Sequence, residues 1–131
     1  MEDPLHPEML FGLSIPSYIV LHDVGSRSRQ DNTNSSFAVY NIEVTTKYTR
    51  YRLGKRFSDF HRLKLDLEQQ NITPTCEFPR KTWFKSTKES LLEDRRAQLE
   101  TYIKEALSLT YGTSCLTLLA FFEYTKYNTI R

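Results

Sequence analysis

Apolar and polar residues alternate most clearly in residues 37–46 of the chain. The run Phe-Ala-Val-Tyr-Asn-Ile-Glu-Val-Thr-Thr is rich in β-branched and aromatic side chains, which is typical of a strand. Residues 17–24 and 49–57 form similar runs, and Gly54 in the last of them predicts a bulge or a bend. Residues 25–36 contain no apolar side chain and predict a mobile loop. Three strands in succession predict an antiparallel meander.

Helical periodicity begins after the third strand. Phe60, Leu63 and Leu67 recur at i, i+3 and i+7, and Ser58 is placed to cap this first helix.

Two more helices are predicted in the C-terminal half. Residues 86–89 (Ser-Thr-Lys-Glu) form a capping-box pattern, and the helix that follows runs to about Leu109. Residues 74–85 show no helical period, and Thr113 or Ser114 caps a last helix. The order of elements predicts an α+β fold, with a three-stranded antiparallel meander packed against a helical subdomain.

Two arginines stand where a folded domain would rather have apolar side chains. At about 100° per residue, with Leu91 at zero, Arg95 lies near 40° and Arg96 near 140° within the apolar arc of the long helix. Arg96 is close enough to the edge of that arc to reach solvent. We expect Arg95 to point into a cavity beside the core, or to pair with a buried carboxylate or a backbone carbonyl. Arg56, between a basic strand and the first helix, is expected to be partly withdrawn from water as well. Two such guanidinium groups predict an anion-binding pocket, because each is costly to bury without a partner.

Charge is unevenly distributed along the chain. The net charge is only +2, but residues 47–64 and 80–96 together hold 13 of the 18 basic residues and 4 of the 16 acidic ones. This separation favours a localised anionic partner, either a membrane headgroup or a nucleic acid.

The sequence gives little support to catalysis. The three histidines have no metal-ligand spacing, the two cysteines have no evident base, and the four glycines form no phosphate-binding loop. We therefore expect no enzymatic activity, no cofactor and no metal. The cysteine usage fits a reduced cytosolic compartment, and no apolar run is long enough to cross a bilayer. The three histidines are His6, His22 and His61, and the two cysteines are Cys76 and Cys115.

Four segments, residues 56–60, 78–84, 93–103 and 119–122, have an order and spacing that resemble those of the phox-homology (PX) domains, including those of the sorting nexins. Residues 56–60 (Arg-Phe-Ser-Asp-Phe) resemble the Arg-[Tyr/Phe]-x-x-Phe element of that family. Residues 78–84 resemble its Pro-x-Lys loop with a trailing aromatic pair. Residues 93–103 resemble its Glu-x-Arg-x-x-x-Leu-x-x-Tyr/Phe-Leu/Ile helix, and residues 119–122 its closing helix. The likeness spans about residues 17–125.

The resemblance implies a phosphoinositide-binding domain over residues 16–127, between tails at residues 1–15 and 128–131. It implies a cytoplasmic, peripheral membrane protein of trafficking. The implied ligand is phosphatidylinositol 3-phosphate, on the cytosolic face of endosomes or vacuoles.

The resemblance also assigns the headgroup contacts. Arg56 would hold the 3-phosphate, Phe57 would stack on the inositol ring, Lys81 would take the 1-phosphate, and Arg95 would bind the 4- and 5-hydroxyls. The chemistry agrees, since an arginine fork suits a phosphate or two adjacent hydroxyls and lysine suits a phosphate as a point charge. For Phe57, core packing at a strand end is an equal alternative.

Trp83, Phe84 and Lys85 predict a membrane-insertion loop. Aromatic and basic side chains together suit a headgroup layer. The alternative is that one aromatic ring packs beneath the loop. Many family members carry a Pro-x-x-Pro stretch in the long loop, whereas the prolines of that loop here, Pro74 and Pro79, do not have this spacing.

Two other binding functions compete with this interpretation. A nucleic-acid partner would use the same basic segments, but no recognition helix or aromatic sheet motif accompanies them. The second alternative is a PX-like protein-interaction module with weak lipid binding, whose protein effector the sequence does not identify. The complete set of Arg56, Lys81 and Arg95 argues against it.

Overall fold

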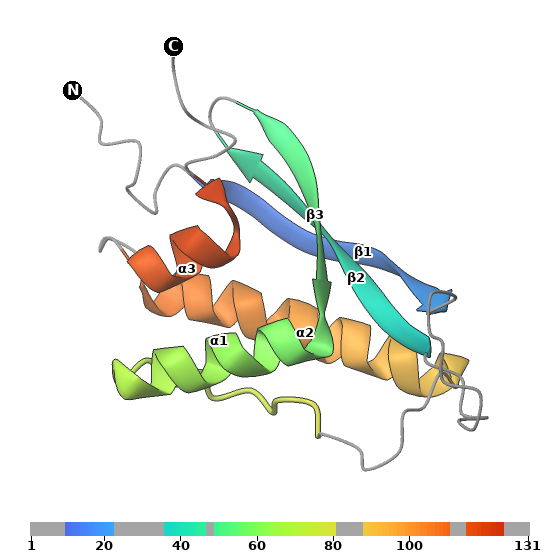
Figure 1. Cartoon of the computed structure of the whole chain (residues 1–131). Coiled ribbons are helices and arrows are strands. Elements are labelled where there is room, and N and C mark those ends of the chain that lie inside the picture. The colour runs from blue at the N-terminus through green and yellow to red at the C-terminus, as the bar shows by residue number, and fades with distance from the viewer. Residues whose placement is uncertain (1–9, 23–35, 47–48, 81–87, 111–114, 125–131) are drawn as a thin grey trace, which may run out of the picture.

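Three strands form one antiparallel sheet with the order β1-β2-β3, and three helices lie on one side of it (Figure 1). This computed structural model describes residues 10–22, 36–46, 49–80, 88–110 and 115–124. The meander and the α+β class predicted from the sequence are confirmed. The elements are β1 (Leu10–His22), β2 (Ser36–Thr46), β3 (Arg50–Arg56), α1 (Phe57–Gln69), α2 (Glu89–Leu109) and α3 (Leu116–Phe121).

One face of the central strand β2 is buried, and its other face is more exposed. Tyr40, Ile42 and Val44 alternate with less buried residues, as a period of two requires. The buried side chains pack against the helices, and together they form one hydrophobic core. The largest fully buried side chains among the described residues are Tyr40, Tyr124, Phe60, Phe122, Ile15, Ile42, Leu67, Leu92, Leu99, Ile103, Leu118 and Val44.

Strand β1 begins earlier than the sequence predicted. Residues 10–15 were expected in a tail, but they pair with the far end of β2. The register shifts between Ser14 and Ser17, where Pro16 lacks an N–H for the ladder. Side chains of α2 satisfy the backbone there, since Ile15 donates its N–H to Glu100 at 2.7 Å and accepts from Arg96 at 2.7 Å. The side chain of Arg96 is 20% exposed and also pairs with the exposed Glu93 at 2.6 Å, so it reaches solvent as expected while it also serves the fold.

Gly54 lies in a regular part of the sheet. It pairs with Asn41 without a shift of register, so the predicted bulge at this position is wrong. A Cβ atom at Gly54 would lie 2.8 Å from Cγ1 of Val39, which is too close for an ordinary contact. The glycine therefore serves close packing on the outer face of the sheet.

Helix α1 follows β3 directly. Arg56, and not Ser58 as predicted, occupies its N-cap position. The Asp59 carboxylate accepts the backbone N–H of Arg56 at 2.8 Å, which satisfies a donor at the start of the helix.

The other two helices begin close to their predicted positions. Lys88 occupies the N-cap of α2, and Cys115 that of α3. The residues predicted to cap them (Ser86, Thr87, Thr113 and Ser114) lie outside the described part of the chain. Tyr51 of β3 donates its hydroxyl to the carbonyl of Phe122 at 2.8 Å and so ties the sheet to the end of α3.

Candidate functional site

Arg95 lies on the buried face of α2, as its position on the helical wheel predicted. It is 9% exposed and shares that face with Leu92 and Leu99. Its Nη2 donates to the carbonyl oxygen of Arg80 at 3.1 Å, and its Cζ lies 4.5 Å from the centre of the Phe57 ring. Arg95 thus binds a backbone carbonyl, which the sequence left open as an alternative, and joins α2 to the start of α1.

Arg56 is exposed, so the expectation that it is withdrawn from water is wrong. Alternation along β3 explains the result, because Tyr51 and Leu53 are buried while Arg52 and Arg56 are exposed. The guanidinium of Arg56 lies over the ring of Phe37, with Cζ 3.9 Å from the ring centre. This cation–π contact uses none of the N–H donors of Arg56.

Phe57 is half-buried and belongs to an aromatic cluster at the junction of β3 and α1. The centre of its ring lies 5.8 Å from that of Phe78 and 6.3 Å from that of His61, with Arg95 on it as described. The structure therefore brings Phe57 and Arg95 into contact. The contacts agree with the packing role that the sequence left open for Phe57.

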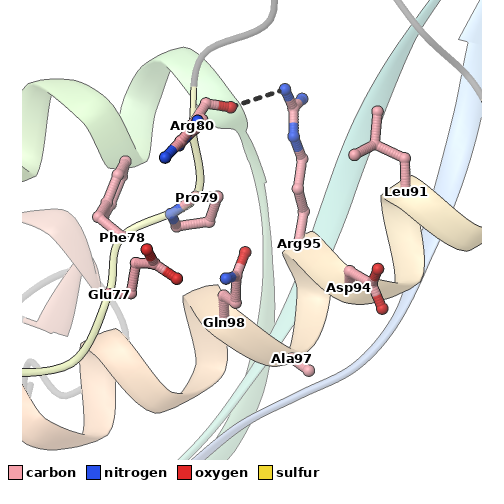
Figure 2. Close-up of a pocket in the computed structure, with 9 residues that line it drawn as sticks. All are labelled: Glu77, Phe78, Pro79, Arg80, Leu91, Asp94, Arg95, Ala97 and Gln98. Atoms are coloured by element: carbon pink, nitrogen blue, oxygen red, sulfur yellow. Dashed lines mark hydrogen bonds between the residues drawn. The ribbon is translucent and has the colours of Figure 1, made fainter.

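A pocket of ≈ 560 Å³ lies between α2 and the loop after α1 (Figure 2). Its size is within the range of roughly 300–1,000 Å³ that is usual for small-molecule sites. Two cationic side chains, two carboxylates, one amide and four apolar residues line it. They are Arg80, Arg95, Glu77, Asp94, Gln98, Phe78, Pro79, Leu91 and Ala97.

Arg56 and Phe57 are not among the residues that line this pocket. Arg95 connects the two regions, since it lines the pocket and also contacts Phe57. Of the four predicted headgroup residues, the structure thus places Phe57 and Arg95 together and leaves Arg56 beside them on the outer face of the sheet.

The remaining predicted site residues are Lys81 and the membrane-insertion residues Trp83, Phe84 and Lys85. All four lie outside the residues that the structure describes. Arg80, the last described residue before them, is anchored by its carbonyl to Arg95. The residue that precedes these four is therefore held against α2.

Sequence reasoning missed the acidic residues of the pocket. Asp94 lies outside the apolar arc of the helical wheel, and Glu77 belongs to a loop without periodicity. Neither position carries a signal that separates it from an ordinary solvated carboxylate. Only the packing of the loop against α2 brings the two to one pocket.

Behind Arg95, burial raises the pKa of the Tyr40 phenol, and the positive charge of Arg95 opposes that shift. Tyr40 is fully buried in the core. The guanidinium of Arg95 is therefore set between a buried neutral phenol and the pocket.

A second pocket of ≈ 600 Å³ lies beside α1 and α3, and Lys55, Arg62 and Asp66 are among its lining residues. Lys55 forms an ion pair with Glu123 at 3.4 Å and lies 5.1 Å over the ring of Phe121. These contacts indicate that the charge of Lys55 serves the fold.

A small antiparallel sheet with helices on one side, and a buried arginine at a pocket near the junction of β3 and α1, define a class of α+β binding domain. The PX domain family model matches residues 43–125, and the chain belongs to this family. PX domains are generally phosphoinositide-binding, membrane-targeting modules and are typically not enzymes.

Solved structures agree with this assignment. A designed CISK-PX domain superimposes with a TM-score of 0.67 at 26% identity and covers 85% of this chain and 97% of its own. The mouse SNX19 PX domain, solved with a bound sulphate ion, has a TM-score of 0.61 at 16% identity and covers 87% and 96%. At that identity the second likeness shows the fold alone. No curated protein matches the chain.

Two further features of the described residues bear on function. None of their helices is long and apolar enough to cross a membrane. Among these same residues, no group of three or more His, Cys, Asp or Glu side chains is placed to hold a metal ion.

Proposed function

We propose that this PX domain binds phosphatidylinositol 3-phosphate and thereby attaches the protein to the cytosolic face of endosomal or vacuolar membranes during trafficking. The observation that carries the proposal is the placement of Arg95, which is buried, fixed by the Arg80 carbonyl, and at once part of a pocket and in contact with Phe57. A buried arginine beside a pocket is a natural ligand for an anionic or hydroxyl-rich group.

In this proposal each headgroup residue has a separate task. Arg95 donates to the 4- and 5-hydroxyls, and Phe57 stacks on the inositol ring. Arg56 binds the 3-phosphate with its N–H donors, while its guanidinium lies over the ring of Phe37. Lys81 takes the 1-phosphate.

Membrane attachment adds a second, less specific contribution. Trp83, Phe84 and Lys85 would insert at the headgroup layer beside the bound lipid. Each basic residue near an anionic surface contributes roughly 1 kcal/mol, and aromatic insertion adds to that. Neither contribution is selective, so selectivity must come from the pocket.

Liposome co-sedimentation across the phosphoinositide series tests the proposal, with Arg56→Ala beside the wild type. We expect selective pelleting with phosphatidylinositol 3-phosphate and about a tenfold or greater loss in the variant, because hydrogen bonds to a charged group contribute about 1.5–3 kcal/mol. Arg52→Ala is the matched control, since Arg52 is exposed on the same face of β3 and pairs with Glu43 at 3.1 Å.

A second function is favoured by two observations. Arg56 faces the outer side of the sheet, and the pocket at Arg95 holds as many carboxylates as guanidinium groups. Both would suit a PX fold kept for protein contacts with weak lipid binding. Equal pelleting with every anionic lipid, or none, in wild type and both variants would support this function and contradict the first.

A further inference from the structure

The pocket at Arg95 has an unusual charge composition for a phosphate site. Glu77 and Asp94 line it together with Arg80 and Arg95 (Figure 2). Both acidic residues are exposed, and neither forms an ion pair with any residue that the structure describes. Within the described part of the chain their charges therefore have no ion-pair partner, and they act on whatever enters the pocket.

Hydroxyl and phosphate groups respond differently to such a lining. A hydroxyl both donates and accepts hydrogen bonds, so it can meet a carboxylate as well as a guanidinium. A phosphate ester carries negative charge and has little to donate, so a carboxylate repels it. The amide of Gln98, in the same pocket, can pair with either group.

Arg95 alone cannot exclude a phosphate. Its fixed, buried guanidinium would attract an anion more strongly than a neutral hydroxyl, because charge-assisted hydrogen bonds are the stronger ones. Negative charge near the guanidinium would disfavour a phosphate at this pocket and leave a neutral hydroxyl acceptable. The structure provides that charge on both walls, with Asp94 on α2 and Glu77 on the facing loop.

We propose that Glu77 and Asp94 are specificity-determining residues of this domain. They make the pocket accept the face of an inositol ring that carries free hydroxyls and reject one that carries further phosphates. The inference rests on the proposed function and deepens it, because it assigns selection against 4- and 5-phosphorylated headgroups to two carboxylates.

Titration calorimetry with soluble short-chain phosphoinositides provides the test. The ligands are the 3-phosphate, the 3,5-bisphosphate and the 3,4,5-trisphosphate, and the proteins are wild type, Glu77→Gln, Asp94→Asn and the double variant. We expect affinity for the two more highly phosphorylated ligands to rise about threefold for each carboxylate removed and about tenfold for both, at low salt. Affinity for the 3-phosphate should change by less than about twofold, since the proposed function places its phosphate at Arg56, which does not line the pocket of these carboxylates.

Asp66→Asn is the matched control. Asp66 is an exposed acidic residue that lines the second pocket, so its replacement removes one charge without touching the first pocket. Far-UV spectra and thermal unfolding of each variant show whether the fold is kept. We expect this control to leave the preference among the three ligands unchanged.

The outcomes separate this inference from the proposed function. If the wild type prefers the 3-phosphate and the double variant keeps that preference, the inference is wrong and the proposed function stands. An equal gain for all ligands that Asp66→Asn also shows would likewise overturn it, as a general charge effect. If the wild type binds none of the three, both fail.

Discussion

Among single residues, Arg95 has the clearest double role, in the fold and at the pocket. Its planar fork donates to the Arg80 carbonyl while its Cζ lies over the Phe57 ring, and a lysine cannot reproduce both contacts. We predict that Arg95→Lys keeps the charge but lowers the free energy of unfolding by about 1–2 kcal/mol. It should also weaken binding of soluble phosphatidylinositol 3-phosphate by about tenfold or more, because the fork to two hydroxyls is lost.

Chemical denaturation and calorimetry on the same preparations check both parts of this prediction. Arg62→Lys is the control, because Arg62 is exposed on α1. A variant of Arg95 as stable as this control would show that the contacts with Arg80 and Phe57 add nothing measurable.

Arg95 and Arg56 also show what sequence can and cannot predict at this scale. A helix has one buried arc, so the position of Arg95 followed from counting residues. Arg56 stands where a strand passes into a helix, and its direction depends on which face of the strand is buried. The motif assigned a headgroup contact to Arg56, which stays a prediction, and it gave no information about the exposure of the side chain.

Among the elements, the loop after α1 is attached to α2 by one carboxylate. Glu105 accepts the N–H and the hydroxyl of Thr75, the latter at 2.9 Å, and the N–H of Cys76 at 3.2 Å. These hydrogen bonds hold the pKa of Glu105 below its usual range. The loop continues from there to Arg80, so this attachment contributes to the position of one wall of the pocket.

The sign of the pH effect follows from that lowered pKa. A carboxyl group whose pKa is lower in the folded state stabilises the fold above its unfolded pKa, near the ordinary value of 4.5, and loses that effect as pH falls through the folded pKa. We predict that Glu105→Gln speeds hydrogen exchange at Thr75 and Cys76 at pH 7. The difference from wild type should shrink as the pH falls below 4.5, the ordinary pKa of the carboxyl group. A change within the pocket at Arg95, such as Gln98→Glu, would alter that pocket as well. Asp66→Asn is therefore the control. Unchanged exchange in Glu105→Gln at pH 7 would contradict the prediction.

Strands were predicted unequally well, for a physical reason. Strand β2 is central and alternates, so its own sequence shows both its type and its buried face. The first half of β1 contains Gly12 and Pro16, which predict a break, and its backbone at Ile15 is completed by side chains of α2 that lie 81 and 85 residues away. No local pattern contains that information.

For the whole molecule, the separation of charge makes membrane attachment depend on salt. Most basic residues fall in residues 47–64 and 80–96, which include β3, the first part of α1 and the first part of α2. Basic residues of these segments that face an anionic bilayer would act on it over a Debye length, which shrinks from about 30 Å at 0.01 M to about 10 Å at 0.1 M salt. Contacts inside the pocket are shorter and are screened less.

We therefore predict two different salt dependences for the same domain. Binding to liposomes that contain phosphatidylinositol 3-phosphate should weaken by at least about tenfold between roughly 0.05 and 0.5 M salt, because several basic residues contribute about 1 kcal/mol each at low salt. Binding of the soluble short-chain lipid should weaken by less, since it lacks the extended surface. Co-sedimentation and calorimetry in matched buffers measure the two. Parallel slopes would mean that the basic segments do not meet the membrane, and the charge separation would then have to serve a protein partner.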